Sequence, residues 1–155
     1  MSRDEEIQRW HRLYKQETGA REVLLEEFAD WMVGKGWPLP TPITARERLV
    51  KQCAAALRIE TKTDQETGEP YRVNHMYIVI REGDQYHLWF DIDDAEREPM
   101  QAALTLRREQ VVGDMTQLVR DAEHWSRRNP EDEPIVIQMD LGLDVEIRRS
   151  TPADV

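Results

Sequence analysis

The sequence contains a single cysteine, Cys53, among 155 residues. A disulfide needs two cysteines, so the chain cannot form an intrachain bridge, and its composition does not indicate an oxidising compartment. Cys53 lies in the apolar stretch LVKQCAAAL, where we expect a buried and unreactive thiol on a helix. A catalytic thiol would need a nearby base, and the sequence gives no signal for one.

Long apolar runs are also absent. No run approaches the ~20 residues that a membrane-spanning helix needs. The N-terminal stretch MSRDEEIQRW is polar and acidic, which is unlike a secretory signal. These features predict a cytoplasmic protein that does not enter a membrane.

The common signatures of enzymes are missing as well. The sequence has no glycine-rich phosphate loop, no G-x-S-x-G motif and no catalytic-cysteine motif. None of the 4 histidines lies at metal-ligand spacing from another histidine or from the cysteine, which argues against a zinc site. We therefore favour a protein without enzymatic activity and expect no cofactor.

Acidic residues outnumber basic ones by 31 to 21, which gives a formal net charge of −10. An acidic chain repels a polyanion at long range, which argues against tight non-specific binding of nucleic acid. The excess is uneven, because residues 43–75 contain 6 basic and 5 acidic residues. This segment is therefore the candidate for a local basic surface.

The remaining patterns predict a single α+β domain over residues 1–150, followed by a frayed tail, 151–155. In chain order we expect three N-terminal helices, an antiparallel β-hairpin, one long amphipathic helix and a C-terminal strand. The first two helices are expected at about 4–16 and 22–33, where apolar residues recur at three- and four-residue steps.

The stretch from Pro99 to Arg128 is expected to form the long helix. Its apolar stripe consists of Leu104, Val111, Met115, Leu118, Ala122 and Trp125. Charged residues such as Arg107 are expected to face water. At ~1.5 Å per residue this helix would be roughly 45 Å long, which exceeds the width of a compact domain of this size. The stripe could therefore cover the chain's own sheet or pair with a second copy in a homodimer.

The third helix is expected to begin at Thr44, where Glu47 three residues later completes a capping-box pattern. It would run to about Arg58, with an extension to Lys62 left open. The following turn, DQETGEP, is acidic and is marked by a glycine and a proline.

Two segments, 72–80 and 86–92, are rich in β-branched and aromatic residues and are expected to pair as a hairpin. Side chains alternate between the two faces of a strand with a period of two. This period predicts that Ile78 lies opposite Leu88, with residues 81–85 as the loop.

The C-terminal region shows a regular alternation of apolar and polar residues over 135–147. Such alternation is typical of a half-buried strand. We expect this strand to bend at Gly142, to extend the sheet of the hairpin and to lie beneath the long helix.

Basic residues follow one side of the expected third helix and continue past its end. The candidates for nucleic-acid contacts are Arg48, Lys51, Arg58, Lys62 and Arg72. The order of helices, a basic helix and a β-hairpin over residues 21–92 resembles a winged-helix domain. In this family the third helix enters the major groove of DNA and the hairpin touches the backbone or the minor groove. The resemblance implies a non-enzymatic adaptor or regulator that binds duplex DNA. The alternative is an ordinary solvated helix face.

A second candidate site is acidic and consists of Asp91, Asp93 and Asp94. The spelling D-x-D resembles the motif of primase-like and nucleotidyltransferase strands. Alternate carboxylates lie ~7 Å apart on one side of a strand, where they could hold Mg²⁺ or Mn²⁺ for phosphoryl transfer. The alternative is a cap at the start of the long helix, which the helix dipole favours. A third hypothesis is an acidic module that binds an unknown protein partner.

Overall fold

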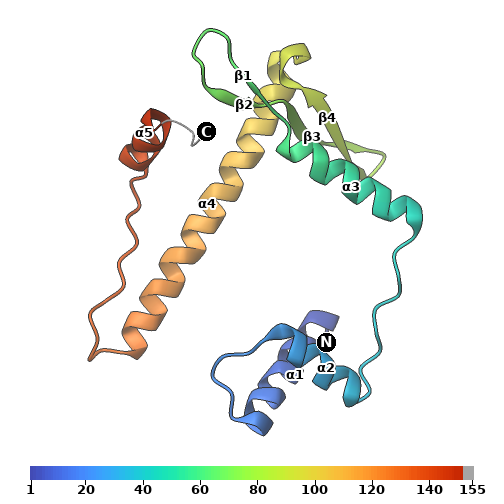
Figure 1. Cartoon of the computed structure of the whole chain (residues 1–155), viewed down its shortest axis with the longest axis vertical. Helices are drawn as coiled ribbons and strands as arrows, with labels where there is room; N and C mark the ends of the chain where they lie inside the picture. The colour runs from blue at the N-terminus through green and yellow to red at the C-terminus, as the bar shows by residue number, and fades with distance from the viewer. Residues whose placement is uncertain (152–155) are drawn as a thin grey trace. The chain divides into compact units, whose positions relative to one another are not determined.

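A computed structural model describes residues 1–151 (Figure 1). The described residues form five α-helices, a short 3-10 helix and two small antiparallel sheets, so the expected α+β class is confirmed. The chain divides into two compact units, Met1–Arg48 and Leu49–Val155, where the sequence suggested one domain over 1–150. Each unit is described by itself below. The tail that was expected to fray lies almost entirely outside the described residues.

The first unit contains two helices, α1 (Arg3–Thr18) and α2 (Leu25–Gly34), as predicted. α1 begins at a capping box, in which the side chains of Ser2 and Glu5 each accept a hydrogen bond from the other residue's backbone amide. It ends at Gly19, whose positive φ of 72° is the usual left-handed helix terminus. The core of this helix pair is aromatic and consists of Tyr14, Phe28 and Met32, with Trp10, Trp31 and Trp37 packed against them.

Helix α3 (Ala45–Ile59) begins with the expected capping box between Thr44 and Glu47. The extension to Lys62, which the sequence left open, does not occur, because α3 ends at Ile59 and Lys62 lies in strand β1 (Thr61–Thr63). Pairing with β2 gives the backbone of this segment a hydrogen-bond ladder in place of another helical turn.

Cys53 is exposed on α3, so the expectation of a buried thiol is wrong. α3 has no fully buried residue, and only Ala54 and Leu57 are partly buried. The helix therefore contacts its neighbours along one narrow side, and the thiol lies off that side. The apolar character of the stretch did not reveal how little of the helix would be covered.

The predicted hairpin is present as β3 (Asn74–Arg81) and β4 (Asp84–Asp91). Its expected register is wrong by one residue, because Ile78 pairs with His87 and not with Leu88. A shift of one residue moves every side chain of one strand to the opposite face of the sheet. A shorter hairpin, formed by β1 and β2 (Pro70–Arg72), precedes it in the chain.

The tight turn between β3 and β4 explains the register. Glu82 and Gly83 both have positive φ, 51° and 82°, as in a type I′ turn of two residues. The expected loop of residues 81–85 would have needed a longer connection. As a result Trp89 pairs with Met76 and shares its face of the hairpin.

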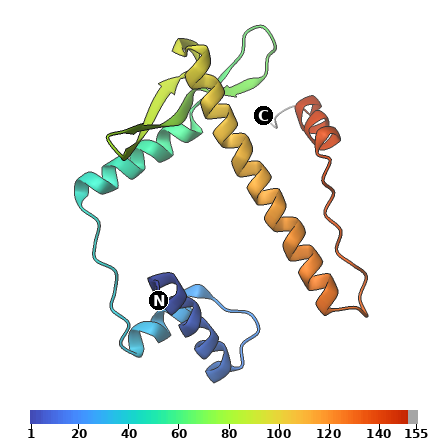
Figure 2. The same ribbon diagram turned by 180° about the vertical axis from the view of Figure 1, so that it is seen from behind.

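Helix α4 (Arg97–Arg128) confirms the long central helix and contains 32 residues. It crosses the β3–β4 hairpin near its own N-terminal end (Figure 2). The buried side chains of the second unit are Ala103 on α4, which is 0% exposed, and Val73 and His75, which are 2% and 4% exposed. No helix in the described part of the chain is both long and apolar enough to span a membrane.

The apolar stripe of α4 is about half exposed along its length, and Leu104 and Val111 near the hairpin are 48% and 53% exposed. Leu118 and Trp125 are 50% and 41% exposed. A homodimer through this stripe stays a prediction.

The expected C-terminal strand over 135–147 is wrong. This region runs without regular structure to Leu141 and then forms α5 (Gly142–Ser150). Asp140 accepts a hydrogen bond from the amide of Gly142 and starts the helical turn. α5 also has an acidic first turn and a basic last turn, which the helix dipole favours. These helix signals outweigh the alternation of apolar and polar residues, which favours a strand.

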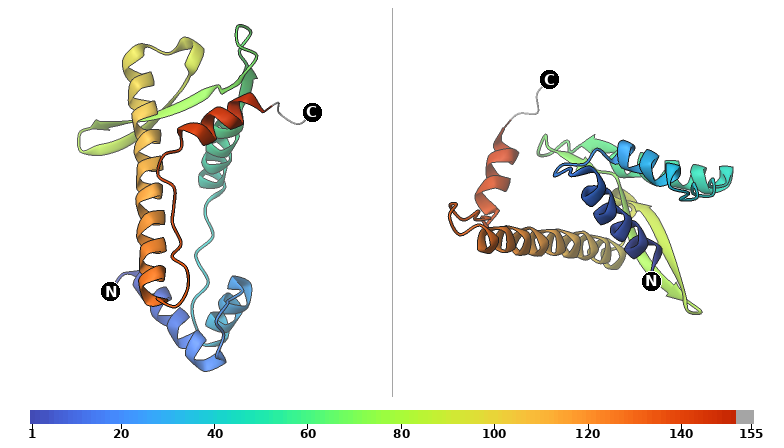
Figure 3. Two further views of the ribbon diagram at one scale, coloured as in Figure 1. Left: turned by 90° about the vertical axis from the view of Figure 1, so that its left-hand side faces the viewer. Right: turned by 90° about the horizontal axis from the view of Figure 1, so that it is seen from below.

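The C-terminal region is attached at two points. The amide of Ile135 donates to Ser126 Oγ at 3.0 Å, where the chain turns back from the end of α4 (Figure 3). Arg149 on α5 forms a two-point ion pair with Glu69, at 3.0 and 2.9 Å, and this pairing lowers the pKa of Glu69.

The β3–β4 turn gives a test of the observed register. Glu82→Asn should raise the free energy of unfolding by about 0.5 kcal/mol, because asparagine tolerates positive φ better than glutamate does. Gly83→Ala should lower it by about 1 kcal/mol. Urea denaturation of the two variants beside the wild type would measure both. Changes of the same sign in the two variants would contradict the turn.

Candidate functional site

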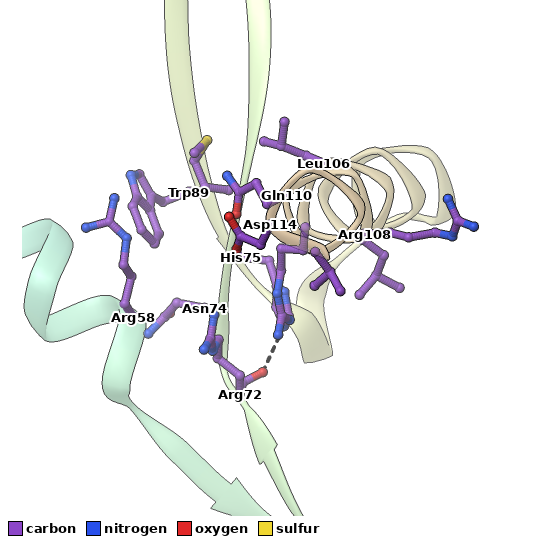
Figure 4. Close-up of a pocket in the computed structure, with 13 residues that line it drawn as sticks. Arg58, Arg72, Asn74, His75, Trp89, Leu106, Arg108, Gln110 and Asp114 are labelled. Atoms are coloured by element: carbon purple, nitrogen blue, oxygen red, sulfur yellow. Dashed lines mark hydrogen bonds between the residues drawn. The ribbon is translucent and has the colours of Figure 1, made fainter. Parts of the chain in front are cut away.

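The second unit contains a cleft of about 600 Å³ between the end of α3, the β3–β4 hairpin and α4 (Figure 4). Four arginines line it together with one tryptophan: Arg58, Arg72, Arg107, Arg108 and Trp89. We call this feature the basic cleft. Its volume lies in the range of ligand-binding pockets.

Arg58 and Trp89 form one wall of the basic cleft. Arg58 is in the last turn of α3, and its guanidinium carbon lies 5.4 Å from the centroid of the Trp89 ring. This distance is within the range of a cation–π interaction. The observed hairpin register places Trp89 on the face that meets Arg58.

Arg72 and Arg107 bring two like charges together. The pKa of Arg107 is lowered, first by burial and then by the positive charge of Arg72. Among residues 1–151 neither guanidinium has a carboxylate within ion-pair distance. Two neighbouring cations without a counter-ion favour the binding of an anion.

Asn74 and His75 fix the base of the basic cleft. The Asn74 amide donates to the Leu57 carbonyl at 3.1 Å and to Glu60 Oε1 at 2.8 Å, which ties β3 to the end of α3. His75 Nε2 lies 2.9 Å from the Arg72 carbonyl, so this nitrogen carries the proton and donates. The buried ring of His75 thereby holds the backbone of Arg72 in place.

His75 Nδ1 is buried and has no hydrogen-bond partner among the described residues. An uncharged acceptor of this kind costs free energy unless water or a ligand group satisfies it. The sequence gives His75 no metal-ligand partner and indicates that it lies on a sheet face that a helix covers or that lines a binding surface.

The α4 wall of the basic cleft is mixed in charge. Gln110 and Asp114 lie on it beside Arg107, and Figure 4 shows both pointing from α4 toward the hairpin. Arg108 forms an exposed ion pair with Glu109 at 3.3 Å, so Glu109 partly neutralises its charge.

The structure brings only part of the predicted basic set together. Arg58 and Arg72 line the basic cleft. Arg48 and Lys51 lie earlier on α3, and Lys62 lies in β1, so these three do not. The winged-helix interpretation of residues 21–92 spans both units and stays a hypothesis.

Sequence reasoning missed Arg107 as a member of the site. Arg107 lies between the apolar stripe of α4 and the flank that meets the hairpin, and its spacing from Leu104 and Val111 could have revealed this. The sequence indicated that Trp89 could line a binding surface, but the expected hairpin register placed it on the wrong face.

Two of the three acidic candidates carry out local structural tasks, and the third, Asp94, is exposed in the 3-10 helix. Asp91 caps the 3-10 helix Ile92–Asp94 by accepting a hydrogen bond from the Asp93 amide at 2.8 Å. Asp93 in turn accepts a hydrogen bond from the Tyr71 hydroxyl at 2.9 Å. In the part of the chain that the structure describes, no three His, Cys, Asp or Glu side chains group around a metal position.

The sequence predicts an aspartate cap at the start of the long helix. In the structure Asp91 instead caps the 3-10 helix that precedes α4. The N-cap of α4 is Glu96, which makes no capping hydrogen bond through its side chain.

Comparisons with known proteins give no relative. No family model matches the sequence, and neither the curated proteins nor the solved structures include a match.

The contact between Tyr71 and Asp93 can be tested by titration. The pKa of Tyr71 is raised, first by its hydrogen bond to Asp93 and further by burial and the nearby carboxylates. Asp93→Asn should bring this pKa back toward its ordinary value, because the hydrogen bond to a charged acceptor is lost. Ultraviolet difference titration against a Tyr71→Phe reference would measure the change. Asp94→Asn is the control, and an equal effect there would contradict the contact.

Proposed function

We propose that the protein is a non-enzymatic adaptor or regulator that binds nucleic acid, with the phosphate backbone held in the basic cleft. The observation that carries this proposal is that Arg72 and Arg107 line the same cleft, and that neither guanidinium has a carboxylate within ion-pair distance in residues 1–151. Guanidinium groups match the geometry of phosphate oxygens and bind them through two parallel hydrogen bonds.

Further cations support a polyanion over a single small anion. Arg58 belongs to the same cleft, and Lys51 lies seven residues before it on the same side of α3. Both are exposed, and among the described residues neither forms an ion pair. Cations spaced along a helix that leads into a cleft can follow a chain of phosphates.

The net charge of −10 sets the expected character of the binding. Long-range repulsion disfavours loose association over the whole surface, so contacts should be confined to the basic cleft and its approach. Because such contacts release counter-ions, the affinity should fall steeply as salt rises.

Arginine substitutions test this proposal. Arg72→Ala and Arg107→Ala should each weaken binding about tenfold and reduce the salt slope by about one, because each removes a phosphate contact. Fluorescence anisotropy with labelled single-stranded and duplex oligonucleotides, at ~50 and ~200 mM salt, would measure this. Arg81→Ala is the matched control, because Arg81 is exposed at the end of β3 and outside the basic cleft.

The proposal fails if no oligonucleotide binds in a salt-sensitive way. It also fails if Arg81→Ala weakens binding as much as the two cleft variants do, because the effect would then follow net charge alone.

Asp114 gives a test with the opposite sign. Its carboxylate lines the basic cleft and repels a phosphate there, so Asp114→Asn should tighten binding by roughly two- to tenfold. Asp121→Asn is the control, because it removes the same charge from α4 outside the cleft. The same anisotropy titrations apply. Weaker binding by Asp114→Asn would place the phosphates elsewhere.

A further inference from the structure

We infer that the basic cleft accepts an unpaired base, so that the protein binds single-stranded nucleic acid in preference to duplex. This inference rests on the proposed function and adds to it the state of the strand. It starts from the surroundings of Trp89, the tryptophan among the residues that line the cleft.

Trp89 is placed as a stacking surface. It is only partly buried, and its ring meets the Arg58 guanidinium at 5.4 Å. Trp31 and Trp37 in the first unit also have a cation over the ring, but both pack against the buried core of that unit. Trp89 instead lines the basic cleft. Here the group over the ring is a long, charged side chain on an exposed residue, which a ligand can displace.

A base can take the position of the guanidinium on the Trp89 ring. Every base has a flat π-face, and stacking on an aromatic side chain is the usual means by which proteins hold unpaired nucleotides. Arg58, once displaced, stays within reach of the adjoining phosphate, so its charge is not lost from the site. The same two residues therefore serve the empty and the occupied cleft.

The size and charge of the cleft agree with this occupant. A volume of about 600 Å³ suits one or two nucleotides and cannot admit a double helix. In a duplex the bases stay stacked inside, so a duplex could present only phosphates and would leave Trp89 without a contact. A single strand can bring a base to Trp89 and its phosphates to Arg72 and Arg107.

Binding in the winged-helix manner gives the opposite expectation. There α3 would enter a major groove and the hairpin would touch the backbone. Duplex would then bind more tightly than single strand, and the affinity would not depend on the Trp89 ring.

Three labelled probes separate these cases by fluorescence anisotropy. They are a single strand of about twelve nucleotides, within the ~4–16 nucleotides that such sites span, its duplex, and an abasic strand with the same number of phosphates. We expect the wild-type protein to bind the single strand about tenfold more tightly than either of the others.

Variants of the full chain then locate the effect. Trp89→Leu should bring the single strand down to the affinity of the abasic strand, while the abasic strand itself binds as before. Trp89→Phe should retain most of the difference, because phenylalanine keeps a flat ring. Trp125→Leu is the matched control, since Trp125 lies on α4 outside the cleft. Circular dichroism melts confirm that each variant is folded.

The outcomes distinguish the inference from the proposed function. Equal binding of all three probes, still weakened by Arg72→Ala, would overturn the inference and leave the proposed function standing. Tighter binding of duplex, or a single-strand preference that Trp89→Leu does not change, would also overturn the inference. Absence of binding to every probe would overturn both.

Discussion

The second unit depends on the close packing of α4 against the β3–β4 hairpin. Ala103 is completely buried, and a methyl side chain at this position lets the helix approach the strand closely. His75 lies in the same buried region, and its hydrogen bond to the Arg72 carbonyl extends the contact into the basic cleft. Without this packing, Arg72 at the end of β2 and Arg107 on α4 would have no reason to converge.

Convergence of like charges is the second constraint on the molecule. Arg72 and Arg107 lie together although their repulsion opposes it, and an acidic chain with 31 carboxylates supplies none to them within the described residues. An anion bound between two such cations would relieve their repulsion. The proposed function and the base-stacking role of Trp89 both develop from this cluster.

Local signals made a large part of the fold predictable. The capping box at Thr44 and the long helix α4 are encoded in neighbouring residues, and both are present. The hairpin register was missed because it depends on Glu82 adopting positive φ, which is unusual for glutamate. Helix α5 was missed because the alternation of apolar and polar residues over 135–147 predicts a strand, whereas the helix signals near Gly142 are local and weak in the sequence. For the site, Arg58 and Arg72 were found, whereas Arg107 and Trp89 required tertiary contacts.

The uncovered stripe of α4 has a consequence for how the protein behaves in concentrated solution. Leu118 and Trp125 are about half exposed, while the formal charge of −10 keeps copies of the chain apart. Salt shortens the reach of that repulsion to about 8 Å at physiological ionic strength but leaves apolar attraction in place. Added salt should therefore promote self-association of the protein, because the exposed apolar side chains of α4 on different copies of the chain then come into contact.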